Sequence, residues 1–136
     1  MEYVYAAFCG CGKTFLSKTF PDNYIEIECW EYRSGDFPTN YVDDVIKAIG
    51  KIKYLFISTD PEILKEINKR GIKIKLYYPD NTLRNEYLDR FINRQSPVDF
   101  IGVLMVNWDK WINELKEQEY CEHIVLQSGQ YLYDVL

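Results

Sequence analysis

The sequence has little of several features, and each scarcity excludes a class of protein. Its 16 Lys and Arg against 21 Asp and Glu give a net charge of −5, which argues against a general nucleic-acid-coating surface. No apolar run reaches the roughly 18–20 residues of a membrane span. The first residues lack a basic segment followed by a signal-like apolar run. We therefore expect no membrane partner, no general nucleic-acid binding and a cytoplasmic location.

Cysteine and histidine are too few and too poorly spaced to indicate a metal site. The sequence has four cysteines and one histidine, His123. Cysteines of a cytosolic protein are usually free thiols. Single residues separate Cys9 from Cys11 and Cys121 from His123, whereas zinc ligands are usually separated by two to four residues. We expect free thiols that behave as small apolar side chains.

The rest of the composition is that of one globular domain. The chain has 136 residues, of which 47% are hydrophobic, so it can bury a sizeable core. Apolar runs of strand character alternate with segments of helical periodicity. We expect strands at 3–8, 24–30, 53–60, 72–78 and 123–127, with helices between them that include 83–95 and 97–118. This order predicts an α/β fold, a three-layer sandwich around a mostly parallel five-stranded sheet, in a single domain of residues 1–136.

The most specific motif connects the first strand to the first helix. Residues 7–14 are Ala-Phe-Cys-Gly-Cys-Gly-Lys-Thr, which match seven of the eight positions of the phosphate-binding pattern G-x-x-x-x-G-K-[ST]. Ala7 replaces the first glycine. In such a loop several backbone N–H groups surround phosphate oxygens, and glycine permits the close approach. The alternative is an ordinary glycine-rich turn followed by a surface lysine.

The motif assigns a role to each of its residues. Lys13 would reach the β- and γ-phosphates of ATP, and the hydroxyl of Thr14 would bind Mg²⁺. The predicted ATP-binding set is Cys9, Gly10, Cys11, Gly12, Lys13 and Thr14.

Three arginines on the helix at 83–95 are candidates for catalysis. On a helical projection Arg84 falls within the apolar stripe, Arg94 near one margin, and Arg90 just beyond it. Guanidinium groups bind phosphate in a bidentate manner, and phosphoryl transfer needs cations around the transferring group. We favour Arg84 and Arg94, because Arg90 could instead pair with Glu86 four residues earlier.

Two carboxylates lie near the expected ends of strands. Asp60 could bind Mg²⁺ together with Thr14, although Asp60-Pro61 is also typical of a helix N-cap. Glu28 follows Glu26 on the second strand and could contact Mg²⁺-bound water, a ribose hydroxyl or the acceptor, which makes it a candidate substrate-binding residue. Strand alternation alone would place both glutamates on a solvated face.

Together these features resemble the P-loop kinase fold. They comprise the motif at 8–14, the acidic strand at 25–28, the strand end at 57–60, and Tyr78-Pro79 followed by the three arginines. More narrowly, the layout is similar to small adenylate-kinase-like (nucleoside monophosphate kinase-like) proteins of bacteriophages. The resemblance implies ATP and Mg²⁺ as cofactors, phosphoryl transfer to a nucleotide, and a lid-like segment around 80–96 that carries the arginines. A viral protein of this kind would act in the host cytoplasm.

Two departures from this family support other hypotheses. Ala7 alters the loop motif, and the segment 31–40 leaves little room for a separate monophosphate-binding domain. The first alternative is therefore a nucleotide-binding protein, catalytically weak or inactive, that acts through a partner. The second is an interaction protein whose aromatic residues, among them Tyr131, Tyr133, Trp108 and Trp111, form a partner surface.

Overall fold

A single parallel sheet organises residues 3–136, the part of the chain that the computed structural model describes. Its strands are β1 (Tyr3–Ala7), β2 (Tyr24–Glu26), β3 (Tyr54–Ile57), β4 (Lys73–Pro79) and β5 (Cys121–Leu126). They lie in the spatial order β2-β3-β1-β4-β5, and every neighbouring pair is parallel. The predicted α/β class and five-stranded sheet are confirmed.

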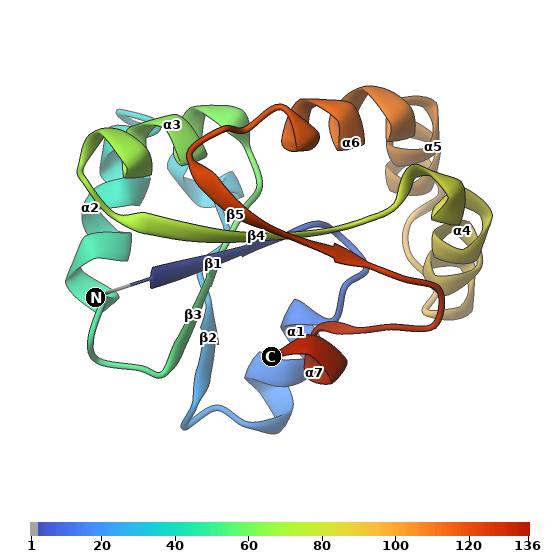
Figure 1. The fold of residues 1–136 in the computed structure, drawn as a ribbon, viewed down its shortest axis with the longest axis horizontal. Helices are drawn as coiled ribbons and strands as arrows, with labels where there is room; N and C mark the ends of the chain where they lie inside the picture. The colour runs from blue at the N-terminus through green and yellow to red at the C-terminus, as the bar shows by residue number, and fades with distance from the viewer. Residues whose placement is uncertain (1–2) are drawn as a thin grey trace.

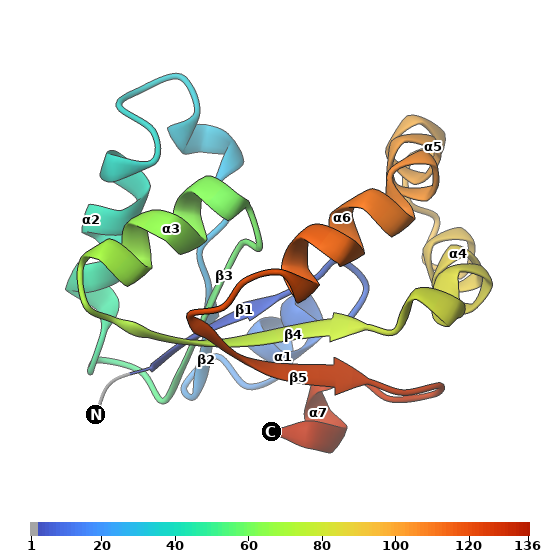
Figure 2. The same ribbon diagram turned by 45° about the horizontal axis from the view of Figure 1, so that its top comes forward.

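Helices cover both faces of the sheet and complete three layers (Figures 1 and 2). On one face lie α2 (Thr39–Ala48), α3 (Pro61–Lys69) and α6 (Trp108–Lys116), and on the other lie α1 (Lys13–Thr19) and α7 (Leu132–Val135). Beyond the carboxyl end of β4 come α4 (Arg84–Asn93) and α5 (Val98–Val106). Two short 3₁₀ helices, η1 (Trp30–Tyr32) and η2 (Asn81–Leu83), follow β2 and β4.

Local signals explain why several of these elements begin where they do. At the start of α3, the Asp60 side chain accepts a hydrogen bond of 2.9 Å from the N–H of Glu62, and Pro61 occupies the first helical position. The central strands β1 and β3 are apolar on both faces because both faces are covered. The largest fully buried side chain is Trp108, whose indole N–H donates to the carbonyl of Asn81.

Two predicted elements differ most from the structure. The helix expected at 97–118 is two helices, because the backbone of Asn107 (φ −96°, ψ 5°) leaves helical geometry and its side-chain amide donates to the carbonyl of Val103. The break turns Trp108 into the core. The strand expected at 24–30 ends at Glu26, since the chain then turns into η1, where the N–H of Tyr32 donates to the carbonyl of Cys29.

The fold places one loop at the point where a ligand is expected. Strand β1 lies between β3 and β4, so the chain winds toward one edge of the sheet after β1 and toward the other after β4. Parallel sheets bind ligands at such a switch point, at the carboxyl ends of the strands. The loop of residues 8–12, hereafter the glycine loop, leaves β1 there (Figure 1).

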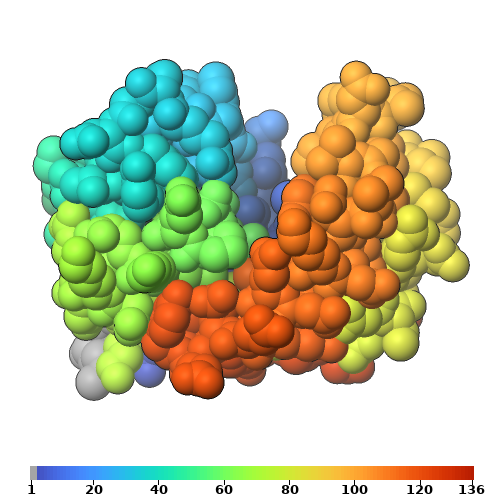
Figure 3. Space-filling view, turned by 90° about the horizontal axis from the view of Figure 1, so that it is seen from above, coloured from blue at the N-terminus to red at the C-terminus, as the bar shows by residue number. Residues whose placement is uncertain are grey.

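Seen from above, the surface is hollowed between two groups of atoms (Figure 3). The cyan atoms around η1 and the orange atoms of α5 stand on either side, and blue atoms of the N-terminal part of the chain lie between them. Among residues 3–136, no helix combines the length and the apolar character needed to cross a bilayer.

Candidate functional site

The glycine loop requires glycine at two positions. Gly10 and Gly12 have φ angles of 84° and 103°, in the left-handed region that side chains rarely adopt. A Cβ at position 10 would also lie 3.0 Å from Cζ of Phe91 and 3.0 Å from Cδ2 of Tyr87. Both rings belong to α4 and are fully buried, so α4 is packed directly against the loop.

Ala7, the departure from the motif, belongs to the strand rather than to the loop. It is the last residue of β1, pairs with Tyr77 of β4 and is fully buried. Its φ is not positive. An alanine therefore fits this position without backbone strain.

The loop leaves a set of backbone donors unused. Within the described chain, no hydrogen bond from the N–H groups of Cys9, Gly10, Gly12, Lys13 or Thr14 reaches another protein group. The N–H of Leu16 is the first of α1 to be bonded, to the carbonyl of Gly12. Because α1 has only seven residues, its helix dipole is short. The loop amides are therefore the main backbone groups that could attract an anion here.

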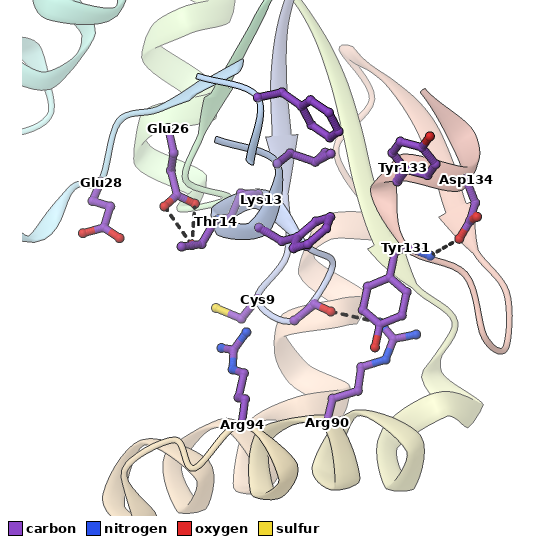
Figure 4. A pocket seen from close by; sticks show the side chains of 15 residues that line it. Cys9, Lys13, Thr14, Glu26, Glu28, Arg90, Arg94, Tyr131, Tyr133 and Asp134 are labelled. Carbon is purple, nitrogen blue, oxygen red and sulfur yellow. Dashed lines mark hydrogen bonds between the residues drawn. The ribbon is translucent and has the colours of Figure 1, made fainter. Parts of the chain in front are cut away.

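The five residues that carry these donors line a cavity of about 870 Å³. Such a volume is typical of a small-molecule site. In Figure 4, Lys13, Thr14 and Glu26 lie on one side of it, Tyr131 and Tyr133 lie on the other, and Arg90 and Arg94 extend toward it from a helix. The lining residues are Cys9, Gly10, Gly12, Lys13, Thr14, Phe15, Leu16, Phe20, Glu26, Glu28, Arg90, Arg94, Tyr131, Tyr133 and Asp134.

Lys13 carries one of the unused amides and also has a cationic side chain. It is the first residue of α1, is half-buried and lines the cavity. None of the ion pairs found in residues 3–136 involves it. Its ammonium group is therefore available to an anionic ligand.

Thr14 and Glu26 form the oxygen-rich part of the cavity. The hydroxyl of Thr14 donates to the Glu26 carboxylate, with distances of 3.1 and 3.4 Å to its two oxygens. Burial raises the pKa of the Glu26 carboxyl, against the opposing effects of Lys13 and of the Thr14 hydroxyl. Mg²⁺ is commonly held by one or two carboxylates, water and phosphate oxygens, so this pair is suited to Mg²⁺ on a phosphate ligand. In the described residues no group of three His, Cys, Asp or Glu could hold a metal by itself.

Asp60, the predicted metal ligand, is engaged elsewhere. Its carboxylate caps α3 and forms an ion pair of 2.5 Å with Arg33. It does not line the cavity. Glu28 does line it, and one of its oxygens accepts a hydrogen bond of 2.8 Å from the indole N–H of Trp30.

The three candidate arginines have three different environments. Arg84 is exposed rather than buried in an apolar stripe, and it donates to the carbonyl of Met105 near the C-terminus of α5, outside the cavity. It acts there as a helix C-terminal cap. Arg94 lines the cavity, lies over the ring of Phe91, and donates to the Ser96 hydroxyl.

Arg90 supports the glycine loop. It donates 2.9 Å hydrogen bonds to the carbonyls of Gly10 and Gln130, and it pairs with Glu86 at 3.2 Å, as the i, i+4 spacing indicates. Only 10% of its side chain is exposed. Its guanidinium is already bonded on both amino groups, so Arg90 positions the loop.

Cys11, predicted to contact phosphate, faces the core. Its N–H donates to the carbonyl of Phe8, and its thiol lies 3.6 Å from the Tyr87 hydroxyl. Burial raises the pKa of this thiol to about 12, so it stays protonated and unreactive at neutral pH. Cys9 is the loop cysteine that lines the cavity.

Sequence reasoning did not assign Tyr131, Tyr133 or Asp134 of the C-terminal segment, residues 127–136, to the site. The N–H of Leu132 donates to the carbonyl of Cys11 at 2.9 Å, which docks α7 on the glycine loop. A Cβ on Gly12 would meet the ring of Tyr131 at 3.4 Å. Tyr131, Tyr133 and Asp134 consequently line the cavity, as do Phe15 and Phe20 of the first helical segment. The only sequence signal for this arrangement was the abundance of aromatic residues.

A second cavity of about 460 Å³ adjoins the first. The two share Thr14, Glu26 and Glu28. The remaining lining of the second cavity is Ser17, Lys18, Ile27, Trp30, Glu31 and Tyr32. Three carboxylates, those of Glu26, Glu28 and Glu31, and one ammonium group, that of Lys18, thus line the second cavity.

Sequence comparison gives the chain no relatives. No model of a known protein family matches it, and no curated protein sequence matches it either.

Proposed function

We propose that the protein binds a nucleoside triphosphate, with Mg²⁺, and transfers its terminal phosphoryl group to a small acceptor. The observation that carries this proposal is that Lys13 and the residues with unused backbone amides line the same 870 Å³ cavity. Phosphoryl transfer depends mainly on positioning and on neutralising charge at the transferring group. Preorganised amides and the ammonium group of Lys13 are suited to both.

The metal requirement is met by Thr14 and Glu26. The Thr14 hydroxyl lies 3.1 and 3.4 Å from the two Glu26 oxygens, and both residues line both cavities. A Mg²⁺ ion that takes phosphate oxygens and water for its remaining ligands needs no larger protein cluster. Arg94, whose guanidinium extends toward Cys9 in Figure 4, supplies a second cation.

The second cavity is the place for the acceptor, because it meets the first at Thr14, Glu26 and Glu28. The resemblance to nucleoside monophosphate kinases makes a nucleotide the expected acceptor. The excess of carboxylates over cations there favours a neutral hydroxyl compound, such as a nucleoside, as the competing candidate. Carboxylates accept hydrogen bonds from hydroxyl groups, whereas they repel phosphate.

The engagement of Asp60 supports a second candidate function. Phosphate-loop proteins use an acidic residue after a strand to hold Mg²⁺. Asp60 is the candidate for that role here, but its carboxylate is already paired with Arg33. A nucleotide-binding protein without transferase activity, which acts through a partner, is therefore the alternative.

The test combines binding with turnover. Calorimetric titration with ATP and Mg²⁺ should detect binding, and Lys13→Ala should weaken it roughly 10- to 100-fold, because a charge-assisted contact is lost. Lys65→Ala, which removes an exposed lysine of α3, should leave binding unchanged. ADP release is then followed with nucleoside monophosphates and with nucleosides.

The outcomes separate the hypotheses. Turnover with either class of acceptor supports a kinase and identifies the acceptor. Tight ATP binding without turnover supports the binding protein. Absence of ATP binding, or equal affinity of the wild type and Lys13→Ala, overturns the proposal.

A further inference from the structure

The large cavity has an aromatic half in addition to the glycine loop. Four aromatic side chains line it, Phe15, Phe20, Tyr131 and Tyr133, with exposed fractions of 61%, 40%, 43% and 64%. Large apolar side chains left in water inside a concave site indicate a ligand that covers them. They share the cavity with Lys13 and the loop amides, so one ligand can contact both halves.

The aromatic rings come from two elements that the fold brings together. Phe20 follows α1, and Tyr133 belongs to α7 on the same face of the sheet. Their ring centroids lie 6.5 Å apart with planes inclined by 16°. Near-parallel rings of this kind offer flat apolar surfaces for a further planar ring.

Fixed hydrogen-bonding groups that could distinguish one base from another are scarce at this end. One oxygen of the Asp134 carboxylate accepts a 2.8 Å hydrogen bond from the N–H of Tyr131. Its other oxygen can only accept, and every base has an N–H donor on its edge, so this oxygen does not select one base. Arg90 is bonded to the carbonyls of Gly10 and Gln130. The hydroxyl groups of Tyr131 and Tyr133 remain, and a rotating hydroxyl both donates and accepts. Stacking without fixed donors and acceptors tolerates every base, since each base has a π-face.

We infer that the aromatic half of the cavity binds the base of the nucleotide by stacking on Phe20 and Tyr133, without recognising the edge of the base. The protein therefore takes purine and pyrimidine nucleoside triphosphates alike. This inference rests on the proposed function, because it assumes that the phosphates lie over the glycine loop.

The same rings could instead form part of a surface for a protein partner. Their place in the cavity argues against this, because a flat protein surface would not reach Lys13 and the loop amides beside them. Tyr131 also packs on Gly12 and lies over Arg90, with the guanidinium carbon 3.9 Å from the ring centroid. Tyr131 is therefore packed against the glycine loop that would hold the phosphates.

The experiment compares ligands with and without a base. Full-length protein is titrated with ATP, GTP, CTP, UTP and inorganic tripolyphosphate, each with Mg²⁺. We expect the four nucleotides to agree within roughly fivefold and to bind at least about tenfold more tightly than tripolyphosphate, given the usual strength of base–aromatic stacking. Phe20→Leu and Tyr133→Leu should each weaken nucleotide binding by roughly tenfold and leave tripolyphosphate binding unchanged.

Three control variants keep the test decisive. Tyr120→Leu replaces an aromatic side chain, 36% exposed, that lines neither cavity, and it should change nothing. Tyr133→Phe and Phe20→Trp retain a ring and should retain affinity, even if a leucine variant folds poorly.

The result also separates this inference from the proposed function. A preference for one base by more than about tenfold overturns the stacking inference, and so does equal nucleotide affinity of the wild type and the leucine variants. Binding of tripolyphosphate in the same experiment would still support the loop site. Loss of binding in Tyr133→Phe also overturns the stacking inference, because the hydroxyl group would then be what recognises the base. Failure of tripolyphosphate and all nucleotides to bind overturns both proposals.

Discussion

Arg90 donates a hydrogen bond of 2.9 Å to the carbonyl oxygen of Gly10, a residue eighty positions earlier in the chain. Its other amino group bonds the carbonyl of Gln130 and the carboxylate of Glu86. The guanidinium also lies over the rings of Tyr87 and Tyr131, 4.3 and 3.9 Å from their centroids. One side chain therefore connects the glycine loop, α4 and the C-terminal segment.

Replacement of this arginine should destabilise the protein far more than replacement of another arginine on the same helix. Arg90→Ala removes the donor to the carbonyls of Gly10 and Gln130 and breaks the ion pair with Glu86, which should cost about 2–4 kcal/mol in the free energy of unfolding. Arg84→Ala removes an exposed side chain that bonds only the carbonyl of Met105, and should cost less than about 1 kcal/mol. Urea denaturation measures both. Equal losses would contradict the supporting role of Arg90.

The glycine at position 10 can be tested against a glycine with the same backbone angle. Gly10 and Gly50 both have φ 84°, but a Cβ on Gly50 meets nothing within 4 Å. Gly50→Ala should therefore cost about 1–2 kcal/mol of unfolding free energy from backbone strain alone. Gly10→Ala should cost about 1–3 kcal/mol more, because its Cβ would lie only 3.0 Å from the buried rings of Phe91 and Tyr87. Denaturation curves of the two variants measure both losses of unfolding free energy. Similar losses would mean that α4 shifts to accommodate the added Cβ at little cost.

The parts of the fold that the sequence predicts are those with local causes. Continuous apolar strands and the Asp60-Pro61 cap depend on neighbouring residues, so β1, β3 and α3 are placed correctly. The break at Asn107 also has a local cause, but the apolar periodicity on both sides of it conceals the change of direction.

The parts of the site that the sequence does not predict depend on contacts between distant segments. Helical projection gives the face of an arginine but not its neighbour, which for Arg84 is a carbonyl of α5. Pairing of Asp60 with Arg33 requires knowledge of where the loop after η1 folds back. Stacking of Phe20 on Tyr133 joins segments near opposite ends of the chain, and nothing in either segment alone indicates the other.

Metal-dependent binding should change with pH through Glu26. Burial raises the pKa of its carboxyl, so protonation begins at a higher pH than for an ordinary carboxyl, and a protonated carboxyl does not bind Mg²⁺. Affinity for ATP in the presence of Mg²⁺ should therefore fall as the pH is lowered from 7 toward 5, more in wild type than in Glu26→Gln. At pH 7 Glu26→Gln should weaken Mg²⁺-dependent binding roughly tenfold.

The control for the metal site is Asp60. Asp60→Ala removes a helix cap and an ion pair, and should cost about 1 kcal/mol of stability while leaving the Mg²⁺ dependence intact. Calorimetry over a Mg²⁺ series measures both variants. If Asp60→Ala abolishes the Mg²⁺ dependence and Glu26→Gln does not, the metal site lies at Asp60 and our assignment is wrong.

The attachment of the C-terminal segment should weaken in acid through Glu86. Its carboxylate accepts hydrogen bonds from the Ser128 hydroxyl and the Gly129 N–H, and these bonds, with Arg90, hold its pKa below the ordinary value of 4.5. A carboxyl with a lowered pKa in the folded state adds stability above pH 4.5 that is lost as the pH falls through the folded value.

Glu86→Gln should therefore be about 1 kcal/mol less stable than wild type at pH 7, and this difference should disappear in acid, below the lowered pKa of Glu86. Asp89→Asn removes an exposed carboxylate of the same helix that makes none of the side-chain hydrogen bonds or ion pairs found in residues 3–136, so it should track wild type at every pH. Urea denaturation between pH 3 and pH 7 provides the comparison. A Glu86→Gln curve parallel to that of wild type would show that this carboxylate does not hold the segment against the glycine loop.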